Sequence, residues 1–245
     1  MALGVGALLV VLAAAGLWWF FSGDAPDRVD LETATRGVRT TLADSSQADG
    51  GTGSTTNEAA DGLDGEWKID TSTGTFDFKS ATGTFAGFRI NEVLSGIGST
   101  EAVGRTGDVD GSFTITGTTV TAAKIDVDLS SITTDESMRD RRVQEALATD
   151  RYPTATFELS DPIELGADVA SGATVEVDAT GELTIHGVTR AVTVPLQARL
   201  VDGTAVVVGS VDVSFSDYGV KVPSSMRVLS VEDHGTVELQ LLLKR

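Results

Sequence analysis

The residue types best suited to catalysis are few in this chain and poorly spaced for it. The two histidines, His186 and His234, are each followed by glycine in a turn context. A serine-histidine-aspartate triad can be written from Ser224 or Ser225 with His234 and Asp233. Neither serine lies in the glycine-framed elbow that presents such a nucleophile. The histidine spacing also fits no common zinc motif, so we expect no catalytic residues and no metal site.

Composition excludes further classes of site. The chain has no cysteine, which excludes disulfides, thiolate metal ligands and cysteine nucleophiles. Its formal net charge of -18 argues against nucleic acid, because such a partner requires clustered Lys and Arg to neutralise phosphates. The glycines of residues 50–53 lack the lysine of a phosphate-binding loop. Binding or structural roles therefore remain.

Residues 133–157 are the one part of the body with helical periodicity. Thr133 and Glu136 fit a capping box, and Pro153 precedes the next strand. Three apolar residues share one helical face: Val143, Ala146 and Leu147. This segment predicts a short helix that closes or props one end of a β shell.

The rest of the body alternates with period two, as strands do. Apolar residues alternate in pairs or longer runs: Trp67 and Ile69, Phe76 and Phe78, Phe88 and Ile90, Phe113 and Ile115, then residues 125–129, 175–185, 192–200 and 237–243. His186-Gly187 and Asp202-Gly203 predict two-residue hairpin turns. Val206 and Val208 are out of phase with Val211, which predicts a bulge at Gly209. The pattern predicts an all-β protein, an antiparallel barrel rather than a sandwich.

The N-terminal region has a different composition. Residues 2–21 carry no charge, can span about 30 Å as a helix, and end near Trp18 and Trp19. We expect a transmembrane anchor there, with a cleaved signal peptide as the alternative. Residues 22–64 have the composition of a flexible linker, although residues 31–42 could form a short helix. The folded domain is then 65–245, on the extracytoplasmic side of the cell membrane.

The order and spacing of several short motifs resemble those of the YceI-like family. They are Trp67-Lys68-Ile69-Asp70, Gly111-Ser112-Phe113, residues 128–134, Arg139-Asp140, residues 152–157 and residues 181–189. Gly104-Arg105-Thr106 resembles a variant seen in membrane-anchored members. Many members carry His-Ser after the first aspartate, whereas Thr71-Ser72 follows Asp70 here.

The resemblance implies a lipocalin-like antiparallel barrel whose apolar interior holds a long isoprenoid chain, without known catalysis. Strand phase then selects the candidate lining residues, with Met138 on the helix: Phe76, Phe78, Phe88, Phe113, Ile115, Met138, Phe157, Leu183, Phe215 and Met226. The resemblance also implies that four residues help to fix this helical segment as a cap on the mouth of the barrel: Arg139, Asp140, Tyr152 and Pro153. A surface ion pair is the alternative interpretation of Arg139 and Asp140.

The sequence thus predicts a membrane-tethered protein that binds an apolar lipid, a polyisoprenoid or isoprenoid quinone, and needs no other cofactor. Two alternatives remain at this point. One is a structural module of the cell envelope with a filled barrel. The other is an envelope hydrolase that uses His186 or His234 as a base. The sequence leaves the oligomeric state open.

Overall fold

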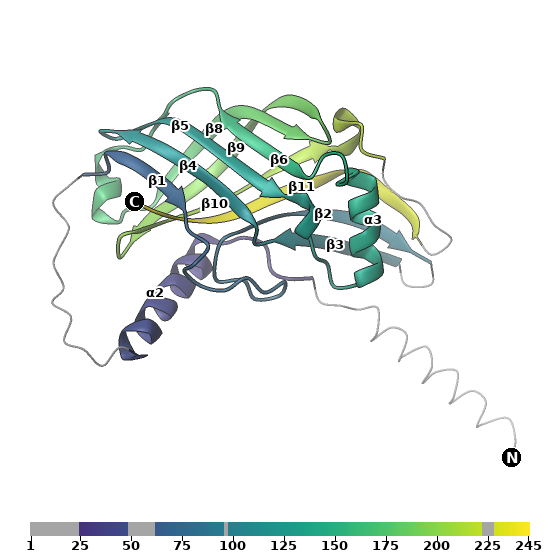
Figure 1. The fold of residues 1–245 in the computed structure, drawn as a ribbon, viewed down its shortest axis with the longest axis horizontal. Helices are drawn as coiled ribbons and strands as arrows, with labels where there is room; N and C mark the ends of the chain where they lie inside the picture. The colour runs from purple at the N-terminus through teal and green to yellow at the C-terminus, as the bar shows by residue number, and fades with distance from the viewer. Residues whose placement is uncertain (1–24, 49–61, 96–97, 222–227) are drawn as a thin grey trace, which may run out of the picture.

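The computed structural model describes residues 25–48, 62–95, 98–221 and 228–245 (Figure 1). The elements follow in the order α2 (Leu31–Ala48), β1 (Gly65–Ile69), β2 (Phe85–Leu94), β3 (Gly98–Thr106), β4 (Val109–Thr116), β5 (Thr119–Asp128), η1 (Leu129–Ser131), α3 (Ser137–Leu147), β6 (Thr154–Leu159), β7 (Ile163–Glu164), η2 (Ala167–Ser171), β8 (Val175–Ile185), β9 (Val188–Val201), β10 (Thr204–Ser214), η3 (Phe215–Tyr218) and β11 (Val228–Lys244).

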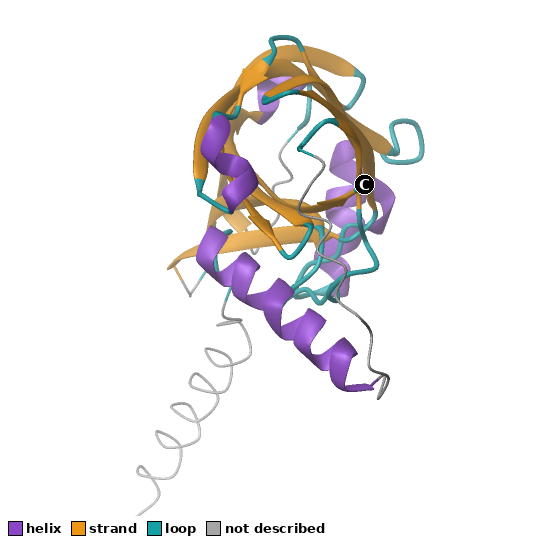
Figure 2. Cartoon of the chain, turned by 90° about the vertical axis from the view of Figure 1, so that its left-hand side faces the viewer, coloured by secondary structure: helices purple, strands orange, loops and turns teal. Residues whose placement is uncertain are grey.

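Eight of the strands close into an antiparallel barrel. Their order is β1-β4-β5-β6-β8-β9-β10-β11, and pairing of β11 with β1 completes the circle. Figure 2 looks along this barrel and draws its strands as a ring. The β2–β3 hairpin extends the sheet from β11, and the short β7 pairs with β5. The all-β barrel with one helical insert is therefore confirmed.

Local sequence explains the tight turns of the barrel. His186 and Gly187 join β8 to β9 with φ angles of 55° and 75°, and Asp202 and Gly203 join β9 to β10 with φ angles of 48° and 80°. Two successive residues with positive φ match the right-handed twist of a hairpin. Both predicted turns are confirmed.

The long strand β11 pairs with a different neighbour at each end of the barrel. Near the C-terminus, Lys244 and Leu243 pair with β1, whereas residues 228–240 pair with β2. The wall at this second end is completed by an isolated bridge between Arg105 of β3 and Thr133. Helix α3 follows directly, and Figure 1 shows it across this end of the sheet. We call this the α3 end.

Two details of the predicted elements are wrong. Phe76 and Phe78 lie in a loop, because the Asp77 carboxylate accepts backbone bonds from Lys79 and Ser80 and so holds a turn. The capping box at Thr133 is also absent, since the backbone of Thr133 pairs with Arg105 and α3 begins only at Ser137. The C-terminus of α3 is set by the left-handed Ala148, before Pro153 is reached.

The predicted bulge at Gly209 is wrong as well. Gly209 pairs in register with both Leu196 and Leu239. Val206 and Val208 instead face outward into a second apolar cluster, where α2 covers them. The change of phase in the sequence therefore reports a second buried face, not a kink in the strand.

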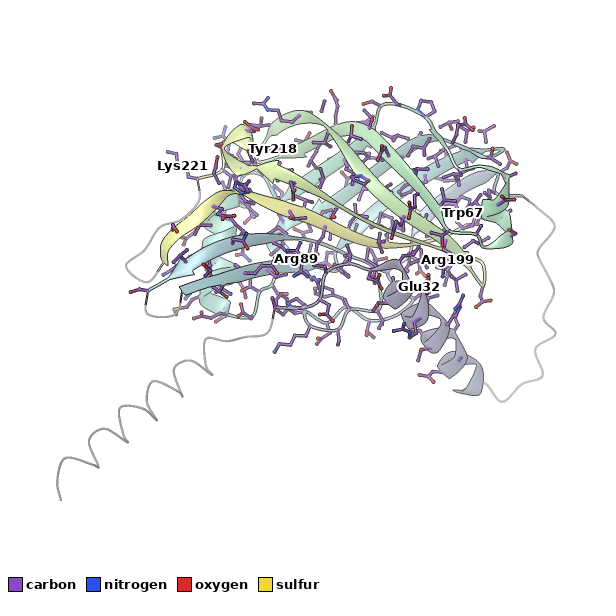
Figure 3. All side chains as sticks on the ribbon, turned by 180° about the vertical axis from the view of Figure 1, so that it is seen from behind. Glu32, Trp67, Arg89, Arg199, Tyr218 and Lys221 are labelled. Atoms are coloured by element: carbon purple, nitrogen blue, oxygen red, sulfur yellow. The ribbon has the colours of Figure 1, made fainter. Side chains whose placement is uncertain are left out.

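Helix α2 occupies part of the segment predicted as a linker. Leu31, Ala34 and Val38 of this helix are buried against β9, β10 and β11. The Arg199 guanidinium lies 2.7 Å from the Glu32 carboxylate, and Figure 3 labels both residues where α2 meets the barrel. Residues 31–48 are thus a docked helix rather than a free tether.

The predicted anchor at residues 2–21 lies outside the described residues. Within the described ranges, no helix is both long enough and apolar enough to cross a membrane.

Candidate ligand-binding lumen

The inward faces of the strands form two apolar clusters along the barrel. One surrounds Trp67 and Leu241, near the closure of β1 on β11. The other surrounds Tyr218 and Leu183 and includes the apolar face of α3. Figure 3 labels Trp67 and Tyr218 near opposite ends of the barrel. The predicted face of α3, formed by Val143, Ala146 and Leu147, packs on this second cluster.

Several inward side chains keep part of their surface uncovered. Phe157 pairs with strands on both sides, at Ile125 and Leu183, yet it is only partly buried. Val237 is also paired on both sides and only partly buried. Both residues belong to the inward clusters, so the inner wall of the barrel keeps apolar surface that neighbouring side chains do not fully cover.

Glycines on neighbouring strands let aromatic rings lie along the wall of this lumen. A Cβ atom added at Gly104 would lie 2.5 Å from the Phe88 ring, and one added at Gly181 would lie 2.5 Å from the Phe157 ring. Real Cβ contacts do not come this close, so any larger residue would displace the ring. The small residues thereby give each ring room to pack directly over a neighbouring strand.

The predicted lining residues divide into three groups. Six belong to the two inward clusters: Phe88, Phe113, Ile115, Phe157, Leu183 and Phe215. Phe76 and Met138 do not line the lumen, because they are 38% and 47% exposed, and Phe78 lies in the same loop as Phe76. Met226 lies outside the described residues. A role for the inward six in ligand contact stays a prediction.

Ion pairs and hydrogen bonds hold α3 over its end of the barrel. Arg139 of α3 contacts Glu92 of β2 at 3.0 Å and also pairs with Asp135. Burial raises the pKa of Glu92, and the Arg139 guanidinium opposes this effect. Asp140 accepts hydrogen bonds from the Thr134 amide at 2.6 Å and from the Thr134 hydroxyl at 2.7 Å.

The other two predicted cap residues lie beside α3. The rings of Tyr152 and His186 meet edge to face, with centroids 5.0 Å apart. The Pro153 carbonyl accepts a hydrogen bond from the Leu129 amide at 2.7 Å. All four predicted cap residues therefore make contacts that join α3 or its flanks to the barrel.

Tyr218 is a buried residue of the α3 end that sequence reasoning missed. It is 2% exposed within the cluster at that end, and among the described residues its hydroxyl has no hydrogen-bond partner. Its backbone carbonyl lies 3.2 Å from His186 Nδ1. The available sequence signal was a lone tyrosine before Gly219, at the end of an apolar strand.

A buried ionic cluster on the outer wall was also missed. Glu238 of β11 binds Arg89 at 2.7 Å and Arg105 at 2.8 Å, and the three side chains are 1–4% exposed. Arg89 donates to the carbonyls of Pro26 and Asp27, each at 2.6 Å, and Arg105 donates to Asp27 at 2.5 Å. We call Arg89, Arg105 and Glu238 the arginine clamp. It fastens the start of the described chain to the barrel.

The wall is incomplete where β9 separates from β10. Their pairing ends at Leu196 and Gly209, although both strands continue. A cleft of about 570 Å³ lies at this point, and its lining includes both outward Asp178 and inward Val177. Val29, which packs with α2 on the outside of the barrel, also lines this cleft.

The residues considered for catalysis do not assemble in the part of the chain that the structure describes. Asp233 accepts hydrogen bonds from the amide and hydroxyl of Ser216, while the exposed His234 lies 3.4 Å from Glu232. Ser224 and Ser225 lie outside the described residues. The described residues contain no group of three or more potential metal ligands.

Comparison with known proteins identifies the type of domain. Residues 67–243 match the family model described as the YceI-like domain. A UPF0312 protein of Pseudomonas aeruginosa is 31% identical over 198 residues, covering 74% of this chain and 92% of that protein. Protein YceI of Shigella flexneri is 34% identical over 127 residues, covering 50% of this chain and 59% of that protein.

Two solved structures share the fold. Burkholderia cenocepacia BcnA has a TM-score of 0.53 at 18% identity, and the match covers 71% of this chain and 98% of that one. A polyisoprenoid binding domain from Saccharophagus degradans, implicated in plant cell wall breakdown, has the same TM-score and identity. That match covers 73% of this chain and 97% of that one.

Proposed function

The chain belongs to the YceI-like domain family, and from this premise we propose that its barrel binds one long apolar lipid, a polyisoprenoid or an isoprenoid quinone. The observation that carries the proposal is a closed barrel whose inward apolar side chains, such as Phe157 and Val237, are only partly buried. The polyisoprenoid binding domain of Saccharophagus degradans, which shares the fold, supports the choice of ligand class. The proposal assigns no catalytic step.

Energetics favour exchange over permanent storage. Burying about 500 Å² of isoprenoid at about 25 cal/mol/Å² stabilises it by about 12 kcal/mol relative to water. A bilayer offers the same ligand an equally apolar solvent, so most of this advantage disappears beside a membrane. In this proposal the ligand exchanges where β9 and β10 separate, beside the cleft.

The location belongs to the same proposal. Residues 2–21 would anchor the chain as a single membrane span, with the barrel on the extracytoplasmic side. The arginine clamp supports close tethering, because it fixes Pro26 and Asp27 on the barrel only a few residues beyond that segment. The barrel would then work beside the bilayer that supplies its ligand.

Mass spectrometry of organic extracts from natively purified protein tests the proposal, and we expect a stoichiometric isoprenoid lipid. Val237→Trp should abolish most of the bound lipid, because Val237 faces the lumen and is only partly buried. The control is Glu182→Trp, at an exposed position of β8. If wild-type protein carries no lipid and takes up none from isoprenoid-loaded vesicles, the barrel is a structural module instead.

A further inference from the structure

The cleft where β9 and β10 separate carries negative charge without a matching cation. Its lining includes the carboxylates of Glu176 and Asp178, and none of the described residues that line it is basic. Both side chains are exposed, and none of the ion pairs among the described residues involves either of them. Glu176 accepts one hydrogen bond, from the Gln197 side-chain amide at 3.0 Å. The cleft therefore has carboxylates to offer to a cation.

The arginine on the same face of β9 is engaged elsewhere. Side chains two positions apart on a strand point to the same face, so Arg199 and Gln197 both point outward. Arg199 Nη2 lies 2.7 Å from a Glu32 carboxylate oxygen and donates to the Thr174 hydroxyl at 2.6 Å. The cation that would complement the cleft has to come from another molecule.

The strand edges at the cleft are open. β9 pairs with β10 only as far as Leu196 and Gly209. Beyond this point, and within the described part of the chain, residues 210–214 pair with β11 alone and residues 188–195 pair with β8 alone. Pro195 has no amide proton, so β9 has no backbone donor at the residue next to the last pair. An unpaired strand edge is a template for an added strand.

Apolar side chains complete the lining of the cleft. Val29 and Val208 belong to the outer cluster beneath α2, and both line the cleft. The cleft volume of about 570 Å³ lies within the range of about 300–1,000 Å³ for natural ligand sites. Carboxylates, apolar surface and an open strand edge thus meet in one place. Together they suit an extended peptide that carries both basic and apolar side chains.

We propose that this cleft docks an extended segment of a partner protein, with a lysine or arginine side chain of that segment beside Glu176 and Asp178. The peptide backbone adds to the open edge of β10, and an apolar side chain of the peptide lies against Val29 and Val208. A polyamine would meet the carboxylates but leave the strand edge unpaired. An isoprenoid tail would leave the carboxylates without a partner. The inference is independent of the ligand proposed for the barrel interior.

Fluorescence anisotropy with the full-length protein in a nonionic detergent tests this proposal. The probe is a labelled hexapeptide of alternating valine and lysine. Its comparators are the valine–glutamate hexapeptide, spermine, and the lysine peptide with N-methyl groups on alternate backbone amides. We expect the unmodified lysine peptide to bind more tightly than every comparator, and to bind more weakly as the salt concentration rises.

Variants of the carboxylates locate the binding. Glu176→Gln combined with Asp178→Asn should weaken binding of the lysine peptide by about threefold to tenfold, as for two exposed ion pairs. Asp178→Lys should reverse the preference, so that the glutamate peptide binds more tightly than the lysine peptide. Glu182→Gln, at an exposed position of β8 outside the cleft lining, is the matched control and should leave both affinities unchanged.

Equal wild-type affinities for the lysine and glutamate peptides, or for the lysine peptide and its N-methylated form, would overturn the inference. Displacement of the probe by an equal concentration of spermine would mean a simple cation site and would also overturn it. Displacement by isoprenoid-loaded neutral vesicles would assign the cleft to the lipid instead. Displacement by unlabelled protein would identify a second copy of the chain as the occupant and would exclude the peptide partner.

Discussion

At the scale of single residues, the inner wall of the barrel depends on pairs of large and small residues. Gly104 and Gly181 have no side chain to hold the Phe88 and Phe157 rings away from the wall. The rings therefore contribute apolar surface without crossing the interior. Strand phase identified Phe88 and Phe157 as inward residues, but the glycine beneath each ring lies on a neighbouring strand and depends on strand register.

The Asp70 carboxylate is held in its ionised form by its contacts at the closure of the barrel. Burial acts to raise its pKa, but hydrogen bonds from Ser72 and Thr73 and the Lys244 ammonium, 3.0 Å away, together hold the pKa well below its ordinary value of 3.8. The Asp70 amide also donates to Leu242 at 2.7 Å. These contacts lie where β1 closes on β11.

Asp70→Asn should therefore destabilise the barrel by about 1.5–3 kcal/mol at neutral pH, the range for hydrogen bonds to a charged group. Because the folded-state pKa is depressed, this stabilisation is complete above 3.8 and is lost as the pH falls below it toward the folded-state pKa. Denaturant unfolding of both proteins from neutral to acidic pH measures the difference. Asp161→Asn, at an exposed aspartate, is the control. A difference that persists unchanged in acid would contradict this assignment.

At the scale of elements, α3 is a cap held by polar contacts at its beginning and apolar contacts along its face. Arg139 reaches Glu92, Asp140 holds Thr134, and three apolar residues pack inward. The sequence predicted the helix and its apolar face. The prediction that Thr133 caps α3 was wrong because of a long-range contact. The backbone of Thr133 forms a β-bridge with Arg105 of β3.

Asp140→Ala should destabilise the protein by about 1–3 kcal/mol, because the Thr134 amide and hydroxyl lose a charged acceptor. We also expect less bound lipid, since α3 would cover the lumen less firmly. Thermal unfolding and lipid extraction measure the two effects, with Asp150→Ala, at an exposed residue after the helix, as the control. If stability and lipid content both match the control, α3 is a solvated helix without a capping role.

At the scale of the whole molecule, the barrel has two buried surfaces. Its inner surface carries the two inward apolar clusters, and part of its outer surface is covered by α2 and by residues 26–27 on the arginine clamp. The outer layer fixes the N-terminal region on the barrel. Residues 26–38 therefore belong to the folded body and not to a linker.

Glu238→Gln tests the clamp, because it leaves Arg89 and Arg105 buried without the carboxylate between them. We expect destabilisation of about 3–5 kcal/mol, as when one partner of a buried ion pair is removed. Denaturant unfolding measures the loss, and Glu182→Gln on the exposed face of β8 is the matched control. A loss no larger than the control's would mean that Glu101, 2.9 Å from Arg89, compensates the charge instead.

Patterns in the sequence were enough to predict the all-β class, the two hairpin turns, the apolar face of α3 and most of the inward residues. Each of these depends on local pattern, either period two in strands, period 3.6 in the helix or positive φ at a turn. Three features became visible only in the folded chain. Val206 and Val208 face α2, and Phe76 and Phe78 lie in a loop instead of a barrel strand. Arg105 also meets Glu238. These outcomes depend on register between strands distant in sequence, where burial is set by what covers a residue. The unpaired hydroxyl of Tyr218 belongs to this second group, since its isolation follows from the packing of the α3 end.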